Sequence, residues 1–181
     1  QKSLALVFFL LLSCPSLAQW KKDFTKPFQF SLAPGVGTDG MHPGGYSNYF
    51  SVNLTSGYSA TNYVFEIAAI SNLNIMETRG LQFAGIANVT GRNAFEKLRE
   101  KEIEKLKREG FEANLSGVQV SGVANIVLNN VFGWQATGGV NLSKGAMFGF
   151  QLAGISNTVY KYSFGVQIAG LYNASVQSMD G

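Results

Sequence analysis

A nine-residue motif that recurs at a fixed spacing constrains the fold of this chain more than any other feature. The motif is Gly-x-Gln-x-small-Gly-x-x-Asn, and its clearest copy runs from Gly165 to Asn173. The second glycine of each copy falls at positions 122, 138, 154 and 170, so the spacing between these copies is constant. A fixed period predicts an array of identical structural units. The five full copies supply these structural repeat residues: Gly80, Gln82, Gly85, Asn88, Gly117, Gln119, Gly122, Asn125, Gly133, Gln135, Gly138, Asn141, Gly149, Gln151, Gly154, Asn157, Gly165, Gln167, Gly170 and Asn173.

The array contains one insertion and begins with a degenerate copy. The step from Gly85 to Gly122 equals one repeat period plus an insert that is longer than a second period. The degenerate copy spans residues 65–72 and has Glu66 in place of glutamine and Ala69 in place of the second glycine. We expect Glu66 to lie on the same face as the glutamines, as a solvated group or, as an alternative, a selectivity or binding group.

Within each copy, apolar and polar residues alternate strictly. In residues 132–142, Phe132, Trp134, Ala136, Gly138, Val140 and Leu142 share one parity, while glycine, glutamine, threonine and asparagine occupy the other. Such alternation predicts a β-strand. A strand of about eleven residues exceeds the usual length of about 5–6 in soluble proteins and suits a membrane-spanning strand.

Charged residues are almost confined to the expected turns. After Phe111 the only charged residues are Glu112, Lys144, Lys161 and Asp180, each in or beside a short polar pair that would join two strands. The simplest interpretation is all-β: an antiparallel meander that closes as a transmembrane β-barrel. Its apolar face would contact lipid, where a mid-plane lysine costs roughly 2–4 kcal/mol, and its Gln and Asn columns would face the lumen.

A soluble β-solenoid is the alternative. Parallel coils of one repeat each would align the glutamines and the asparagines as amide ladders. One argument favours the solenoid. An antiparallel meander of equal strands and equal tight turns accumulates no stagger between strands, whereas a barrel needs such a stagger, the shear, to close.

The repeat resembles the leptospiral-type "surface repeat" family of bacterial envelope proteins. Besides the motif, the segment from Phe30 to Gly40 and the run Phe50-Ser51-Val52-Asn53-Leu54 are similar to the start of that family. The resemblance covers about residues 28–181. It implies an outer-membrane or cell-surface location and no known catalysis.

The domain boundaries follow from the first residues and the array. Residues 1–18 are expected to be a secretory signal, with Lys2 before an apolar core and a small-x-small site before Gln19. A lipobox that ends at Cys14 is the alternative. Residues 19–27 form a lead segment, and residues 28–181 form the β-repeat domain, whose array is expected to be truncated at both ends.

The insert is expected to hold one helix at residues 93–110. Phe95, Leu98, Ile103 and Leu106 fall on one stripe, and lysine, arginine and glutamate occupy the other face. This helix is predicted to pack on its own domain, over the barrel mouth or on an envelope or surface protein.

No constellation of residues points to catalysis. The Gly-x-Gly-x-x-Gly match at residues 35–40 is followed by Met41-His42-Pro43, which does not start the helix that a dinucleotide site needs, so a glycine-rich loop is expected there. We therefore expect no catalytic, metal or cofactor-binding residues and no cofactor. The net charge of +3 is too small to favour nucleic acid. The expected function is a non-enzymatic outer-membrane protein with outer-membrane lipid as its partner, acting as a passive pore or scaffold; the alternative is a soluble or lipid-anchored solenoid that binds at the cell surface.

Overall fold

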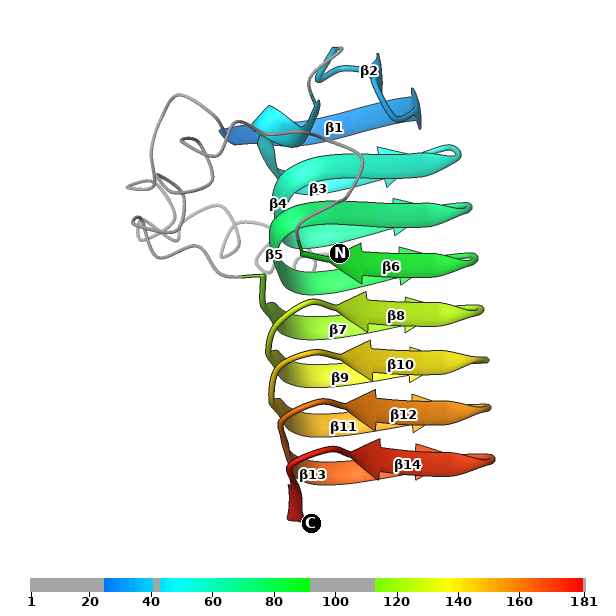
Figure 1. The fold of residues 1–181 in the computed structure, drawn as a ribbon. Coiled ribbons are helices and arrows are strands. Elements are labelled where there is room, and N and C mark those ends of the chain that lie inside the picture. Colours follow the sequence, from blue (N-terminus) through cyan, green and yellow to red (C-terminus); the bar gives the residue numbers. More distant parts are fainter. Residues whose placement is uncertain (1–24, 41–42, 92–112, 181) are drawn as a thin grey trace, which may run out of the picture.

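The chain folds as a β-solenoid, in which each coil contributes strands to two parallel sheets (Figure 1). The computed structural model describes residues 25–40, 43–91 and 113–180. One short 3-10 turn, Pro43–Gly45, accompanies the strands in this part of the chain. The strands are β1 (Thr25–Ala33), β2 (Val36–Gly37), β3 (Ser47–Asn53), β4 (Ser56–Ala68), β5 (Ser71–Ala84), β6 (Ala87–Thr90), β7 (Leu115–Ser121), β8 (Ala124–Val127), β9 (Val131–Thr137), β10 (Val140–Ser143), β11 (Met147–Ala153), β12 (Ser156–Val159), β13 (Tyr162–Ala169), β14 (Tyr172–Ser175) and β15 (Ser178–Asp180).

A regular coil has a long strand, a tight corner, a short strand and a second corner. In the coil of β9 and β10, the first corner is at Gly138-Gly139 and the second is at residues 144–146. The long strands β1, β3, β4, β5, β7, β9, β11 and β13 pair in this order as the first sheet. The short strands β6, β8, β10, β12 and β14 form the second sheet, which the first halves of β4 and β5 extend. We call the corner that contains Gly138 the glycine corner and the other corner the basic corner.

The register of the coils equals the sequence period. Gly133 pairs with Gly149, Gln135 with Gln151 and Asn141 with Asn157, all in parallel strands. The insert does not disturb this register, because Gly80 pairs with Gly117 and Asn88 with Asn125 across it. Each repeat residue therefore lies above its equivalent in the next coil.

The prediction of an antiparallel membrane-spanning barrel was wrong, and the solenoid alternative is confirmed. Adjacent repeats pair in parallel throughout the two sheets, and the only antiparallel pair in the described residues joins β1 to β2. Each repeat period holds two strands, not one. The strand expected over residues 132–142 bends at Gly138 and Gly139, so its two halves lie in different sheets.

Two columns of glycine let the coils approach closely. Gly133 has φ +138° in the middle of β9, and a Cβ there would lie 2.0 Å from the carbonyl oxygen of Gly117. At the glycine corner, a Cβ on Gly154 would lie 2.1 Å from the carbonyl oxygen of Gly138. Backbone rather than side chain fills both places, so any larger residue must push neighbouring coils apart.

The interior of the solenoid is unusually polar. The alternation that suggested a lipid face and a lumen instead separates an outer surface from a packed interior. Glutamine, asparagine, serine and threonine point inward, and the buried apolar cluster in the described part of the chain consists of Leu115, Val127, Val131, Met147 and Val159. Hydrogen bonds between buried groups, rather than apolar burial alone, must therefore hold the interior together.

Some sequence predictions fall on residues that the structure does not describe. The signal segment 1–18, the lipobox cysteine, residues 19–24 of the lead and the helix at 93–110 all lie outside the described residues. Among the residues that are described, no helix is long and apolar enough to cross a membrane.

Candidate functional site

The glutamines of the repeat form one continuous hydrogen-bonded ladder inside the first sheet. Each amide nitrogen donates to the side-chain oxygen one coil earlier: Gln167 to Gln151 at 2.6 Å, Gln151 to Gln135 at 2.7 Å, Gln135 to Gln119 at 2.9 Å and Gln119 to Gln82 at 2.7 Å. The four glutamines from Gln82 to Gln151 are fully buried. Every one of these amides therefore depends on both of its neighbours.

The asparagines form a second ladder that runs in the opposite direction. Asn125 Nδ2 donates to Asn141 Oδ1 at 3.0 Å, Asn141 Nδ2 to Asn157 Oδ1 at 2.8 Å, and Asn157 Nδ2 to Asn173 Oδ1 at 2.8 Å. The same nitrogens also donate to main-chain carbonyls of the next coil, such as that of Leu152. The asparagine ladder thus ties the glycine corner to the coil that follows it.

Glu66 ends the glutamine ladder on its N-terminal side. Its Oε2 accepts from Gln82 Nε2 at 2.9 Å and from Asn74 Nδ2 at 2.9 Å, and its Oε1 accepts from Asn53 Nδ2 at 3.4 Å. In its ionised form the carboxyl group of Glu66 has no hydrogen to donate, so a ladder that donates in one direction can stop there. The structure places Glu66 at 0% exposure, which excludes the solvated position that the sequence suggested.

We expect Glu66→Gln to remove a large part of the pH dependence of stability. Burial raises the pKa of the Glu66 carboxyl from 4.5 to about 7, and the three amide donors oppose this shift only in part. The folded state therefore holds a proton that the unfolded chain releases above about pH 4.5. Stability should fall between pH 4.5 and 7 and level off at a loss of about 3 kcal/mol.

Urea unfolding of the wild-type chain and of Glu66→Gln at pH 5 and pH 9 measures this effect. The variant should gain about 3 kcal/mol over the wild type at pH 9 and little at pH 5. Equal pH dependence in the two proteins would show that Glu66 does not carry a buried negative charge at high pH.

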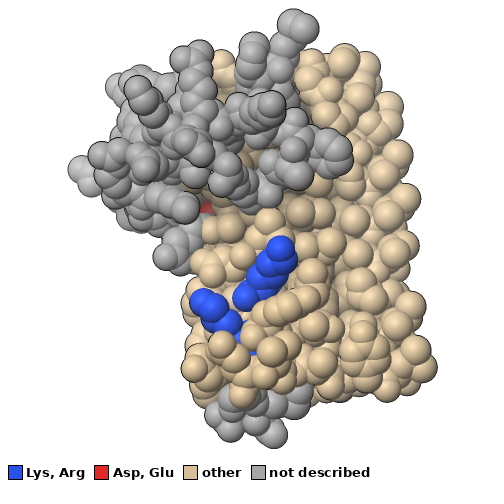
Figure 2. All heavy atoms as spheres, in the orientation of Figure 1, with Lys and Arg blue, Asp and Glu red and all other residues tan. Residues whose placement is uncertain are grey.

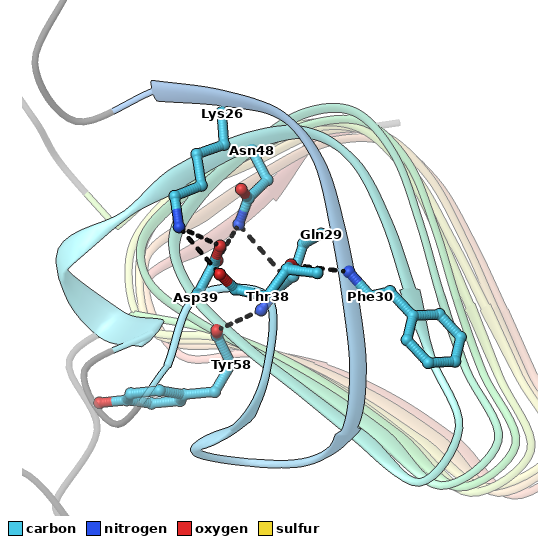
Figure 3. Close-up of polar contacts among 7 residues, drawn as sticks. All are labelled: Lys26, Gln29, Phe30, Thr38, Asp39, Asn48 and Tyr58. Atoms are coloured by element: carbon cyan, nitrogen blue, oxygen red, sulfur yellow. Dashed lines mark hydrogen bonds and ion pairs between the residues drawn. The ribbon is translucent and has the colours of Figure 1, made fainter.

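A second polar cluster closes the N-terminal end of the solenoid (Figure 3). Lys26 Nζ lies 3.0 Å from Asp39 Oδ1, and Asn48 Nδ2 donates to Asp39 Oδ2 at 3.0 Å and to Gln29 Oε1 at 3.1 Å. Lys26 Nζ also lies 3.9 Å from the centre of the Tyr46 ring. The segment that the sequence predicts to be a glycine-rich loop thus folds over the first coil and supplies its buried carboxylate.

The outward side chains of the first sheet form a continuous apolar surface, which we call the apolar face. Outward side chains occur at every second residue of a strand, and we number these positions along the strand, so that β9 has Phe132 at the first, Trp134 at the second and Ala136 at the third. The second and third positions are apolar along the whole sheet, and the first is apolar in the C-terminal coils. The second position has Phe28, Phe50, Phe65, Leu81, Val118, Trp134, Phe150 and Val166; the third has Phe30, Val52, Ile67, Phe83, Val120, Ala136, Leu152 and Ile168; the first has Ser116, Phe132, Phe148 and Phe164. None of these residues is charged, although the first position continues in β5 as Arg79, which pairs with Ser116.

Side chains on the apolar face contact one another along the solenoid but leave much of their surface uncovered. The rings of Phe132, Phe148 and Phe164 stack at centroid distances of 5.2 and 5.1 Å. Trp134 nevertheless remains 62% exposed and Val166 51%. Soluble monomers rarely expose a contiguous apolar patch of more than a few hundred Å². The apolar face is therefore the candidate functional surface of the chain.

The glycine corner extends this apolar surface around one edge of the coil. The residue that follows the glycine column in successive coils is Ile70, Ile86, Val123, Gly139, Ile155 and Leu171, and all except Gly139 are exposed. We call these exposed side chains the corner ridge. No charged residue lies at the glycine corner in the coils that the structure describes.

The opposite corner is basic. Lys144 and Lys161 are exposed there and have no ion-pair partner among the described residues, and Tyr160 and Tyr162 flank Lys161. Figure 2 shows one basic cluster on this side of the molecule, while the surface toward the glycine corner has no charge. Two neighbouring C-terminal coils thus have a lysine at the corner opposite the glycine corner, and tyrosines flank the lysine in one of them.

The structure aligns all the residues of the repeat motif in columns, but these residues lie inside the solenoid or between its coils and do not form a binding surface. The glutamines and asparagines face the interior rather than a lumen, and the glycines permit close stacking. The sequence pattern favours a lipid-facing or core-filling role for the apolar residues, so it does not single them out as a binding site. Across the described part of the chain there is no group of three or more His, Cys, Asp and Glu residues that could hold a metal ion.

Comparison with other proteins gives no guide to function, so the apolar face remains the main one. No protein-family model, curated protein or solved structure matches the chain.

Proposed function

We propose that this chain is an exported, non-enzymatic β-solenoid module that attaches to a surface of the bacterial cell envelope through its apolar face. The observation that carries the proposal is the continuous run of outward-facing, uncharged side chains at the second and third positions of the first sheet, from Phe28 to Ile168, many of which are exposed. Support for export comes from the signal-like segment 1–18 and from the resemblance to bacterial surface-repeat proteins.

Attachment through an outer face differs from spanning a membrane. The side-chain amides of the glutamine and asparagine columns are used by the ladders, so the module has these polar groups inside and its apolar groups available for contact. Burial of apolar surface contributes about 25 cal/mol per Å², and covering even part of the apolar face would stabilise the attached state.

Fractionation of cells that produce the full chain tests this function. The wild-type chain should sediment with envelope membranes and be released by alkaline carbonate, without a heat-dependent shift in electrophoretic mobility. The double variant Trp134→Lys/Val166→Lys should appear in the soluble exported fraction, because two lysines cannot be buried cheaply in an apolar contact.

A matched double variant on the second sheet, Ile126→Lys/Thr158→Lys, is the control. Its two positions also point outward from regular coils, so it should fold and stay with the envelope. Equal fractionation of the two double variants would contradict attachment through the apolar face, and resistance to carbonate would contradict peripheral attachment.

A further inference from the structure

We propose that the surface to which the module attaches is an anionic lipid leaflet, into which the corner ridge and the adjoining edge of the apolar face insert while the basic corner stays among the headgroups. This inference rests on the proposed function and specifies the chemical nature of the surface to which the module attaches. The observation behind it is the placement of apolar and basic residues at opposite corners of the C-terminal part of the solenoid. The corner ridge is apolar, and Lys144 and Lys161 lie at the other corner.

The corner ridge has the properties of a shallow membrane insertion. Ile155 and Leu171 are 45% and 77% exposed and follow each other in consecutive coils, as do Ile70 and Ile86 earlier in the chain. Their main-chain amides are already paired: the N–H of Ile155 donates to the carbonyl of Gly139, and that of Leu171 to the carbonyl of Ile155. These two N–H groups therefore add no desolvation cost when the ridge enters an apolar layer, where each unpaired backbone group costs several kcal/mol.

The basic corner has the properties of a headgroup contact. Tyrosine is enriched at membrane–water interfaces, and Lys161 lies between Tyr160 and Tyr162, both 49% exposed. Lysines near an anionic leaflet are attracted to it, by about 1 kcal/mol for each. The described basic corner therefore complements negative headgroups, whereas a protein partner with an apolar face would gain nothing from two unpaired lysines.

A second copy of the chain is the other occupant that the apolar face could accept, but it explains less of the surface. Two apolar faces packed together would leave the corner ridge and the basic corner at the edge of the contact. Insertion of the glycine-corner edge uses the corner ridge, the third position of the apolar face and the two lysines together. The lipid surface is therefore the occupant that we test.

Binding of the purified chain to lipid vesicles tests this inference, with Trp134 as the probe. Trp134 lies at the second position of the apolar face, beside the edge that inserts, and is 62% exposed, so its emission should shift to the blue when that edge enters lipid. Trp20 is replaced by Phe in all proteins so that it does not contribute to the signal. The vesicles are neutral phosphatidylcholine or a mixture that also contains anionic phosphatidylglycerol.

We expect binding to the anionic vesicles to be stronger than to neutral ones and to be lost in Ile155→Lys/Leu171→Lys. The double variant Lys144→Ser/Lys161→Ser should bind anionic vesicles roughly 25-fold more weakly and neutral vesicles equally well. The control, Ile126→Lys/Thr158→Lys, should bind anionic vesicles at least as well as the wild type. Circular dichroism of each variant confirms that a loss of binding is not a loss of fold.

Three results would overturn the inference. Absence of vesicle binding by the folded wild-type chain would exclude lipid as the partner, and a blue shift that depends on protein concentration alone would assign the apolar face to a second copy. Retained binding by the folded Ile155→Lys/Leu171→Lys variant would exclude insertion of the corner ridge. Envelope fractionation of Trp134→Lys/Val166→Lys would still show whether the apolar face attaches the module at all, so the two proposals fail separately.

Discussion

Gly149→Ala should destabilise the solenoid by more than about 3 kcal/mol. Gly149 lies in the middle of β11 with φ +137°, a conformation that residues with a Cβ rarely adopt. A Cβ there would also lie 2.1 Å from the carbonyl oxygen of Gly133 and 3.0 Å from its carbonyl carbon. Backbone in the preceding coil cannot move aside without loss of the parallel pairing between β9 and β11. The added Cβ therefore causes both backbone strain at residue 149 and steric overlap with the carbonyl group of Gly133.

Urea unfolding followed by circular dichroism measures this effect, with Gly45→Ala as the control. A Cβ on Gly45 would meet no atom within 4 Å, so this substitution should change stability by less than about 0.5 kcal/mol. Similar unfolding midpoints for Gly149→Ala and the wild-type chain would show that the coils are not in the close contact described above.

Gln151→Leu should destabilise the chain by about 3 kcal/mol although it places an apolar side chain in a buried position. Gln151 Nε2 donates to Gln135 Oε1, and Gln151 Oε1 accepts from Gln167 Nε2. Leucine removes both bonds and leaves an acceptor in one neighbouring coil and a donor in the other without partners. Each such unpaired group costs about 1–3 kcal/mol, and the added apolar burial offsets only part of this loss.

Thr158→Leu is the matched control, because it also exchanges a polar residue for leucine in an adjacent strand. Thr158 lies at an outward position of β12, between inward Asn157 and Val159. We expect a change of less than about 0.5 kcal/mol for this variant. If Gln151→Leu were as stable as Thr158→Leu, the amide ladder would not be a principal source of stability.

The sequence predicted the unit of this fold better than its arrangement. The constant repeat period, the inward glutamines and asparagines and the break in the array between Gly85 and Gly122 all reappear as structural features. Alternation of polar and apolar residues does not distinguish a barrel wall from a solenoid wall, because both place alternate side chains on opposite faces. A low charge content likewise suits either a lipid-facing strand or an exposed apolar face.

The deciding signal is the position of the corner within the repeat. Gly138 and Gly139 look like part of a strand when only parity is considered, but two adjacent glycines allow the tight corner between β9 and β10. The identical residue at the same place in every repeat also favours parallel pairing, since an amide ladder needs Gln135 beside Gln151 rather than beside a residue of reversed order. The role of Glu66 could not be predicted, because its burial depends on how the wider N-terminal coils close around it.

Distances between spin labels along one column of the second sheet test the central claim, a stack of parallel coils in register. Ala174 is labelled together with Ile126, Val89 or Leu73, which lie three, four and five strand spacings away. Cys14, the only cysteine in the sequence, is replaced by serine. At about 4.8 Å per strand, dipolar electron paramagnetic resonance should give backbone separations of ~14, ~19 and ~24 Å. A linear increase of this size supports the solenoid, and distances that do not rise by about 5 Å per coil would contradict it.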